Sequence, residues 1–364
     1  MAANEGATLD IAYGDDCIHP SADAWQQRFA AARALLDDTA RVAALARMPR
    51  EGFEPSDTSA PYADVFAGAA DLRAAQSVGV LSGSYNPLTL AHLALAAAAL
   101  THAGLDLVVW TMAAVTVDKE RVERAAVADR LAQLEALAAA CPSSAIARTN
   151  HGLYVDQARA FRALIAPSAR LSFVVGFDKI VQIFDPRYYT DRDATLAALF
   201  ALTDVLVAPR AGMGASALAA LLAQPENARF APHVRLLASP DDYAQDSSTE
   251  ARTLANEAGT DTAASSDRIR ALAPPEGIAL IATGAYRAVG PSTDPYLWRE
   301  RWLRALSPWD DAALAGAPPL SLLTAIATES SVRGDLARRW LVASDGATAR
   351  GLPATPRALF AELT

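Results

Sequence analysis

The sequence predicts an α/β protein in which a doubly wound parallel sheet carries helices on both faces. From residue 77 onward, short apolar runs alternate with amphipathic stretches, and this alternation is typical of βαβ units. The apolar runs are nearly continuous, as expected of strands that are buried on both faces. The composition agrees, because 52% of the 364 residues are hydrophobic and 20% are charged, as in ordinary globular proteins.

Five apolar runs are expected to be strands: SVGVLSG, LDLVVWTM, LSFVVGF, DVLVAPR and VRLLAS. Apolar residues at helical spacing predict helices between them, at 89–103, 127–140, 153–166 and 190–202. In such sheets, ligands bind at the carboxyl ends of the strands, near the point where the strand order reverses. The residues that follow the strands are therefore the first candidates for function.

Both ends of the chain lack the alternation of apolar runs and amphipathic stretches that marks this central part. Residues 1–77 are expected to form a helical N-terminal extension, in which Ser21 caps a helix that runs to about Met48. Residues 78–290 form the α/β domain, and residues 291–364 form a helical C-terminal extension. Four of the six tryptophans lie in this last segment, which indicates that it packs against another part of the protein.

Charge and cysteine content exclude several classes of protein. A net charge of −9 argues against a nucleic-acid-binding surface, although it allows a local basic pocket. The two cysteines are too few for a disulfide framework, and no CxxC metal motif is present. The N-terminus lacks the basic and apolar regions of a secretory signal, and no apolar run is long enough to span a membrane. We therefore expect a cytoplasmic protein with no resident metal and no membrane partner.

The stretch GVLSGSYNPLTLAHLALAAAAL, residues 79–100, combines a strand end, a turn and a helix start. After the strand, the backbone N–H groups of Gly83, Ser84 and Tyr85 could approach a ligand closely. Thr89 is a suitable N-cap, and His92 follows it by three residues, so both side chains share one face of the helix. A helix N-terminus that carries a hydroxyl and an imidazole suits a phosphate. The alternative is a capped helix with one partly buried histidine.

A second stretch, QDSSTEART, predicts another helix start. Ser247 and Glu250 match the capping-box pattern. Arg252 lies four residues after Ser248, so hydroxyls, backbone donors and a guanidinium converge there. The alternative is an ordinary capped surface helix, and the similar SSDRIR at 265–270 competes for the same assignment.

The third predicted strand, LSFVVGF, ends near an acidic residue. Gly176 closes the strand and Asp178 follows it, where a carboxylate could bind a ribose hydroxyl or a water on magnesium. The alternative is an acid that caps the next helix. Lys119, beyond the second strand, could reach a phosphate, although a solvated surface lysine is the commoner explanation.

Taken together, GSYNPLTLAH, VVGFDK and SSTEAR resemble, in this order, the nucleotidyltransferases that carry a GxFxPxHxGH-type signature, a strand ending in G-x-D and an SSTxIR signature. More narrowly, the chain looks like nicotinamide or nicotinate mononucleotide adenylyltransferases. VADRLAQLEALA and LAPPEGIALIATGAY also fit, so the resemblance runs from Val78 to Tyr286. The departures are Thr89 for the first histidine, Ala91 for the following glycine and Ala251 for the isoleucine.

The resemblance implies an α/β nucleotidyltransferase fold and a reaction in which ATP and a mononucleotide give a dinucleotide and pyrophosphate, with Mg²⁺ offsetting charge. It assigns the catalytic roles to His92, Thr89 and Arg252. It assigns nucleotide contacts to Gly83, Ser84, Tyr85, Lys119, Gly176, Asp178, Ser248 and Thr249. The alternatives are a cytidylyl or phosphopantetheine adenylyl transferase, or a protein that binds nucleotide without catalysis. The flanking helices could also mediate homo-oligomerisation.

Overall fold

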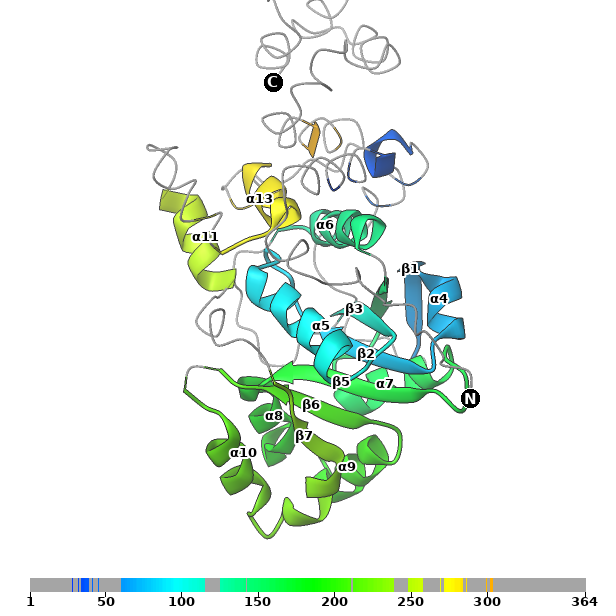
Figure 1. Ribbon diagram of the computed structural model, residues 1–364, viewed down its shortest axis with the longest axis vertical. Helices are drawn as coiled ribbons and strands as arrows, with labels where there is room; N and C mark the ends of the chain where they lie inside the picture. The colour runs from blue at the N-terminus through cyan, green and yellow to red at the C-terminus, as the bar shows by residue number, and fades with distance from the viewer. Residues whose placement is uncertain are drawn as a thin grey trace, which may run out of the picture.

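A computed structural model describes residues 60–114, 125–141, 143–210, 212–238, 248–257 and 272–283, together with residues 28, 32, 34–38, 41, 45, 269, 286, 299 and 302–303. Within these residues, seven strands form one sheet in the order β1-β4-β3-β2-β5-β6-β7 (Figure 1). The strands are β1 (Ala63–Ala67), β2 (Ser77–Ser82), β3 (Leu107–Ala113), β4 (Ser144–Thr149), β5 (Arg170–Gly176), β6 (Asp204–Ala208) and β7 (Val234–Leu236). All neighbouring strands are parallel except β1 and β4.

Helices cover both faces of the sheet, so the predicted doubly wound α/β architecture is confirmed. The helices are α4 (Ala69–Ala74), α5 (Leu90–His102), α6 (Val127–Ala140), α7 (Tyr154–Arg162), α8 (Phe177–Phe184), α9 (Arg192–Phe200), α10 (Ala215–Leu222), α11 (Ser248–Glu257) and α13 (Pro275–Ala282). Helices α5, α6 and α13 share one apolar core with one face of the sheet, and α4 and α7–α10 share a second core with the other face. Figure 1 shows α6 and α13 above the sheet and α9 and α10 below it.

The order of the strands reverses beside β2. The chain goes from β2 to β3 on one side, and β5 later pairs with the other side of β2. The carboxyl ends of β2 and β5 therefore mark the topological switch point, where open α/β sheets bind their ligands. Gly83 follows β2, and Gly176 ends β5.

Two strands were not predicted. The segment Ala63–Ala67 was expected to belong to a helical extension, but it is the edge strand β1, and its Asp64 stands opposite Arg148 of β4. Strand β4 was overlooked because Arg148 interrupts its apolar run. Arg148 is nonetheless buried, and burial lowers its pKa while the charge of Asp64 acts in the opposite direction. The segment before residue 78 was expected to be helical around a loop, and this expectation is wrong over Ala63–Ala67, where the structure has a strand.

The helix expected from Ser21 to Met48 is also interrupted. Residues 34–37 are helical, but Asp38 is not. The Asp38 carboxylate accepts a hydrogen bond of 2.9 Å from the backbone N–H of Arg41. This is the contact that an N-cap makes with the third residue of a helix, and Arg41 and Leu45 are helical.

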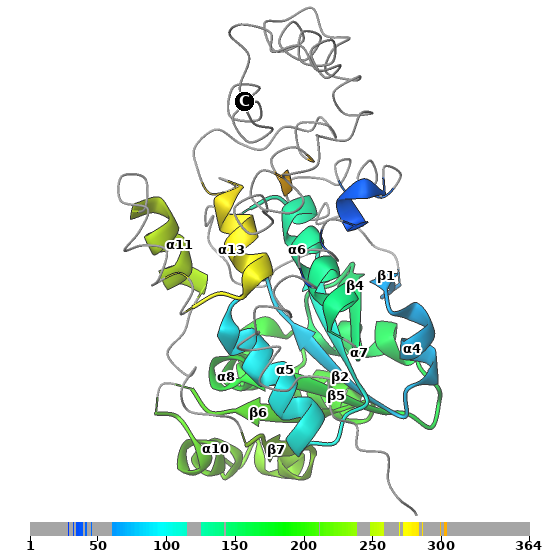
Figure 2. The same ribbon diagram turned by 45° about the horizontal axis from the view of Figure 1, so that its top comes forward.

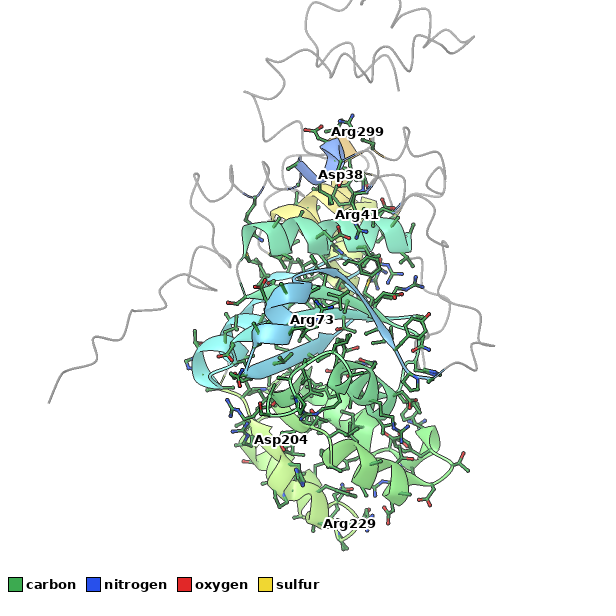
Figure 3. The ribbon with its side chains drawn as sticks, turned by 90° about the vertical axis from the view of Figure 1, so that its right-hand side faces the viewer. Asp38, Arg41, Arg73, Asp204, Arg229 and Arg299 are labelled. Atoms are coloured by element: carbon green, nitrogen blue, oxygen red, sulfur yellow. The ribbon has the colours of Figure 1, made fainter. Side chains whose placement is uncertain are left out.

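Three described residues of the two flanking segments, Arg28, Arg41 and Trp302, contact α6 or α13. Arg28 pairs with Glu276 of α13, and Arg41 pairs with Glu135 of α6. Trp302 is buried and donates to Asp129 of α6 over 2.9 Å, which agrees with the expectation that the C-terminal segment packs. The other three tryptophans of that segment lie outside the described residues. Figure 3 shows Asp38, Arg41 and Arg299 together beyond α6.

No helix within the described part of the chain has both the length and the apolar character that crossing a bilayer requires.

Candidate functional site

The loop between β2 and α5, residues 83–89, lies at the switch point. Tyr85 has a positive φ of 44°, and its ring turns inward beneath the loop. The ring packs edge-on against Trp110, with 5.7 Å between the centroids, and its hydroxyl donates to the carbonyl of Leu81. A Cβ on Gly83 would stand 3.0 Å from the Tyr85 ring. A side chain at position 83 would therefore crowd the Tyr85 ring, and glycine avoids this contact.

Thr89 caps α5, as predicted, and His92 completes the cap. The Nδ1 of His92 accepts the backbone N–H of Thr89 at 3.1 Å and lies 2.7 Å from the Thr89 hydroxyl. A backbone N–H can only donate, so Nδ1 must carry a lone pair and the imidazole proton must be on Nε2. The cap thus fixes both the orientation of the ring and its tautomer. Gly104, at φ 63°, follows the other end of the helix, as expected.

Side chains from two helices hold the carbonyl groups of the loop. From α6, Arg130 donates to Ser84 O over 2.9 Å, and Gln133 donates to Tyr85 O while accepting from Leu88 N–H. From α11, Arg252 donates to Asn86 O over 2.6 Å and Ser248 donates to Pro87 O over 2.8 Å. Four successive carbonyl oxygens are therefore bound. Of the three SSTEAR residues expected to contact a nucleotide, Ser248 and Arg252 reach the loop that precedes His92.

Other predicted residues have different positions. The N–H of Gly83 donates to Thr111 O over 2.9 Å, so it extends the β2–β3 ladder and does not point toward a ligand, contrary to expectation. The Thr249 hydroxyl accepts from Arg252 at 3.0 Å, which helps to orient the guanidinium. Ala251 is fully buried. Lys119, Ser247 and the SSDRIR stretch apart from Ile269 lie outside the described residues.

At the end of β5, Gly176 is the N-cap of α8, and Asp178 lies in the first turn. A Cβ on Gly176 would stand 2.9 Å from the Asp178 carboxylate, so the glycine leaves room for that group. Asp178 is half exposed and lies 3.7 Å from the guanidinium of Arg210. Its charge also adds to the burial that raises the pKa of Tyr154. An acid here suits the helix N-terminus and also stands at the ligand-binding edge of the sheet.

Sequence reasoning missed three residues of the site. Arg130 and Gln133 are buried on α6 and are spaced to share one face of that helix. Two polar residues on an otherwise apolar face are a sequence signal that could have revealed them. The third is Tyr286, a buried tyrosine whose hydroxyl has no hydrogen-bond partner among the described residues. Burial raises its pKa, which the charges of Arg130 and Arg252 oppose.

The arrangement is suited to an anion. The N-terminus of α5 places the positive end of the helix dipole at the loop, and the guanidinium of Arg252 adds a fixed positive charge. Within the first turn, the N–H groups of Leu90 and His92 already donate to Leu272 O and Thr89 O. Within the described part of the chain, no three His, Cys, Asp or Glu side chains form a group that could hold a metal ion.

Residues 80–196 match the cytidylyltransferase-like family model. The predicted resemblance to nucleotidyltransferases is thereby confirmed over this segment, which contains the loop, His92, Arg130 and Asp178. The match to this family supports a transferase that acts on nucleotides. No match among curated proteins was found.

Among solved structures, the chain is similar to the nicotinic acid mononucleotide adenylyltransferase of Plasmodium falciparum complexed with APC. The sequence identity is 14% and the TM-score is 0.40, over 57% of this chain and 94% of that one.

Proposed function

We propose that this protein is an adenylyltransferase that joins ATP to nicotinamide or nicotinate mononucleotide and releases pyrophosphate. The observation that carries the proposal is the position of His92. Its ring is held by the Thr89 cap at a helix N-terminus, at the switch point of the sheet, in a segment that matches the cytidylyltransferase-like family model. The GSYNPLTLAH, VVGFDK and SSTEAR motifs supply the narrower choice of an adenylyltransferase.

The reaction needs alignment and charge neutralisation more than proton transfer. The second pKa of a phosphate monoester is about 6, so the mononucleotide is already mostly dianionic at neutral pH. One of its oxygens would attack the α-phosphorus of ATP, forming a new P–O bond as the bond to the β-phosphate oxygen breaks. The pair of electrons leaves with pyrophosphate. No general base is required, and groups that stabilise the developing charge carry the catalysis.

The site offers such groups in two places. Nε2–H of His92 would donate to a phosphate oxygen of ATP, and the α5 N-terminus would add its dipole. Arg252, which contacts the loop through Asn86 O, would hold the phosphates from the opposite side. Ser248, whose one hydroxyl hydrogen goes to Pro87 O, would fix the start of α11 to the loop. Mg²⁺ would enter with ATP and offset charge, and Asp178 would contact a ribose hydroxyl or a metal-bound water.

A second candidate is a nucleotidyltransferase with another acceptor, of the cytidylyl or phosphopantetheine adenylyl type. It is favoured by one specific observation: the family model that matches residues 80–196 is the broad cytidylyltransferase-like one. A binding protein without catalysis is the third outcome, because Thr89, Ala91 and Ala251 depart from the motifs.

The test is pyrophosphate release from MgATP, with nicotinamide mononucleotide and nicotinate mononucleotide supplied separately and the products resolved by chromatography. We expect a dinucleotide from at least one of them. Pyrophosphate release only with CTP or with phosphopantetheine would favour the second candidate. ATP binding without pyrophosphate release from any acceptor would refute catalysis.

A further inference from the structure

A buried ion pair connects the N-terminal segment to α13. Arg28 donates to both carboxylate oxygens of Glu276, over 2.7 and 2.6 Å, and the two side chains are only 3% and 2% exposed. The partners are 248 positions apart in the sequence. A two-point contact between a guanidinium and a carboxylate fixes direction as well as distance. Breaking a buried pair leaves an uncompensated charge, so the segment that holds it is strongly coupled to its partner.

Glu276 lies in the first turn of α13, and the residues at the start of this helix contact the candidate site. The carbonyl of Leu272, just before α13, accepts the backbone N–H of Leu90, the first residue of α5, over 2.8 Å. The backbone of Gly277 lies so close to Leu88 that an added Cβ would stand 2.4 Å from the Leu88 carbonyl oxygen. The start of α13 therefore contacts both residues that flank Thr89, Leu88 and Leu90.

A parallel set of contacts reaches the loop through α6. Arg41 pairs with Glu135, and Trp302 donates to Asp129, while the same helix holds the loop carbonyls through Arg130 and Gln133. Helices α6 and α13 also pack against each other. Figures 1 and 2 both show α13 between α6 and α11, on the side of the molecule where the described pieces of the two flanking segments lie.

We infer that Arg28 is a positioning residue for the candidate site. It holds the first turn of α13 through Glu276, and this turn holds the residues on either side of Thr89, so that the Thr89–His92 cap keeps its geometry. The inference rests on the proposed function only for the consequence that nucleotide binding weakens when Arg28 is lost. The N-terminal segment thus belongs to the site although it contributes no group to the nucleotide.

The test compares two arginine-to-methionine variants of the full-length chain. Arg28→Met breaks the buried pair. Arg162→Met is the control, because Arg162 is likewise an arginine held by the fold, through three hydrogen bonds to Leu202 O and Ala169 O. These carbonyls precede β6 and β5, so they lie at the amino ends of the strands, opposite the site. Hydrogen–deuterium exchange is measured on peptides covering residues 84–93, and ATP affinity is measured by calorimetry.

In Arg28→Met we expect exchange at 84–93 to rise by about tenfold or more and ATP affinity to fall by a similar factor, with β5 and β6 unchanged. In Arg162→Met we expect the reverse pattern, with exchange rising at β5 and β6 only. Unchanged exchange at 84–93 in Arg28→Met, or an equal rise there in both variants, would overturn the inference.

Two further variants keep the test decisive. Arg28→Met combined with Glu276→Met leaves no buried charge unpaired, so we expect it to restore most of the protection at 84–93. Failure of this rescue would show that Arg28 does not act through Glu276. If Arg28→Met does not fold, Arg28→Lys retains the charge but loses the two-point contact, and it should give a smaller rise at the same peptides. The exchange readout is independent of turnover, so an inactive wild-type protein would refute the proposed function without affecting this inference.

Discussion

The two roles of His92 can be separated by comparing His92→Ala with His92→Asn. Alanine removes both the acceptor of the Thr89 N–H and the Nε2–H donor. Asparagine keeps an acceptor, because its Oδ1 occupies nearly the position that Nδ1 has in histidine, 3.1 Å from the Thr89 N–H. It has no group where Nε2 lies. The asparagine variant therefore retains the cap and loses only the donor assigned to phosphate.

The expected magnitudes differ enough to be measured. Loss of a helix cap costs about 1 kcal/mol, within a total stability of about 5–15 kcal/mol, so His92→Ala should remain folded. Loss of a preorganised donor to the reacting phosphates costs about 10²–10³ in kcat, which corresponds to about 3–4 kcal/mol of transition-state stabilisation. We expect His92→Asn to have a stability close to that of the wild type and a kcat as low as that of His92→Ala.

Denaturant titration gives the stability, and pyrophosphate release under saturating ATP and acceptor gives kcat. If His92→Asn turned over at a rate close to that of the wild type, His92 would be a capping residue alone. If both variants lost activity only in proportion to the unfolded fraction, the same conclusion would hold.

Three other predictions concern stability. Tyr286→Phe should leave the free energy of unfolding unchanged or raise it by about 1 kcal/mol in denaturant titration, because it removes a buried hydroxyl that has no partner among the described residues; a loss of more than about 1 kcal/mol would contradict this. Gly277→Ala should lower it by about 1–3 kcal/mol, because the new methyl group would stand 2.4 Å from Leu88 O; an unchanged midpoint would contradict that contact. Burial raises the pKa of Tyr189 from 10.0 to about 12, and its hydroxyl donates to Ile183 O over 2.7 Å. The contribution of Tyr189 to stability is therefore complete below pH 10 and is lost as the pH rises toward 12. Because Tyr189→Phe cannot ionise, the melting temperature of this variant should fall less steeply above pH 10 than that of the wild type. An equally steep fall in both proteins would refute the assignment.

Sequence patterns predicted those helices and strands that the order of neighbouring residues determines. The apolar runs predicted five of the strands. The Thr89 cap could be predicted because capping depends on residues three positions apart. Strand β1 was missed because a short edge strand with partial exposure has no strong alternation. The roles of Arg130 and Gln133 were missed for a different reason. Their partners are backbone carbonyls of a loop more than 40 positions away, and only the fold brings these groups together.

A capped helix and a phosphate site do not exclude each other at Thr89 and His92, although either one alone would explain the spacing of these two residues. In the structure, Nδ1 of His92 accepts the hydrogen bond of the cap, and this contact places the ring proton on Nε2. Without this cap, the neutral ring could carry its proton on either nitrogen. In the tautomer with the proton on Nδ1, Nε2 would offer a phosphate a lone pair instead of a donor. The structural role of Thr89 is therefore a precondition of the chemical role proposed for His92, and a threonine in place of a histidine at position 89 is compatible with a working site.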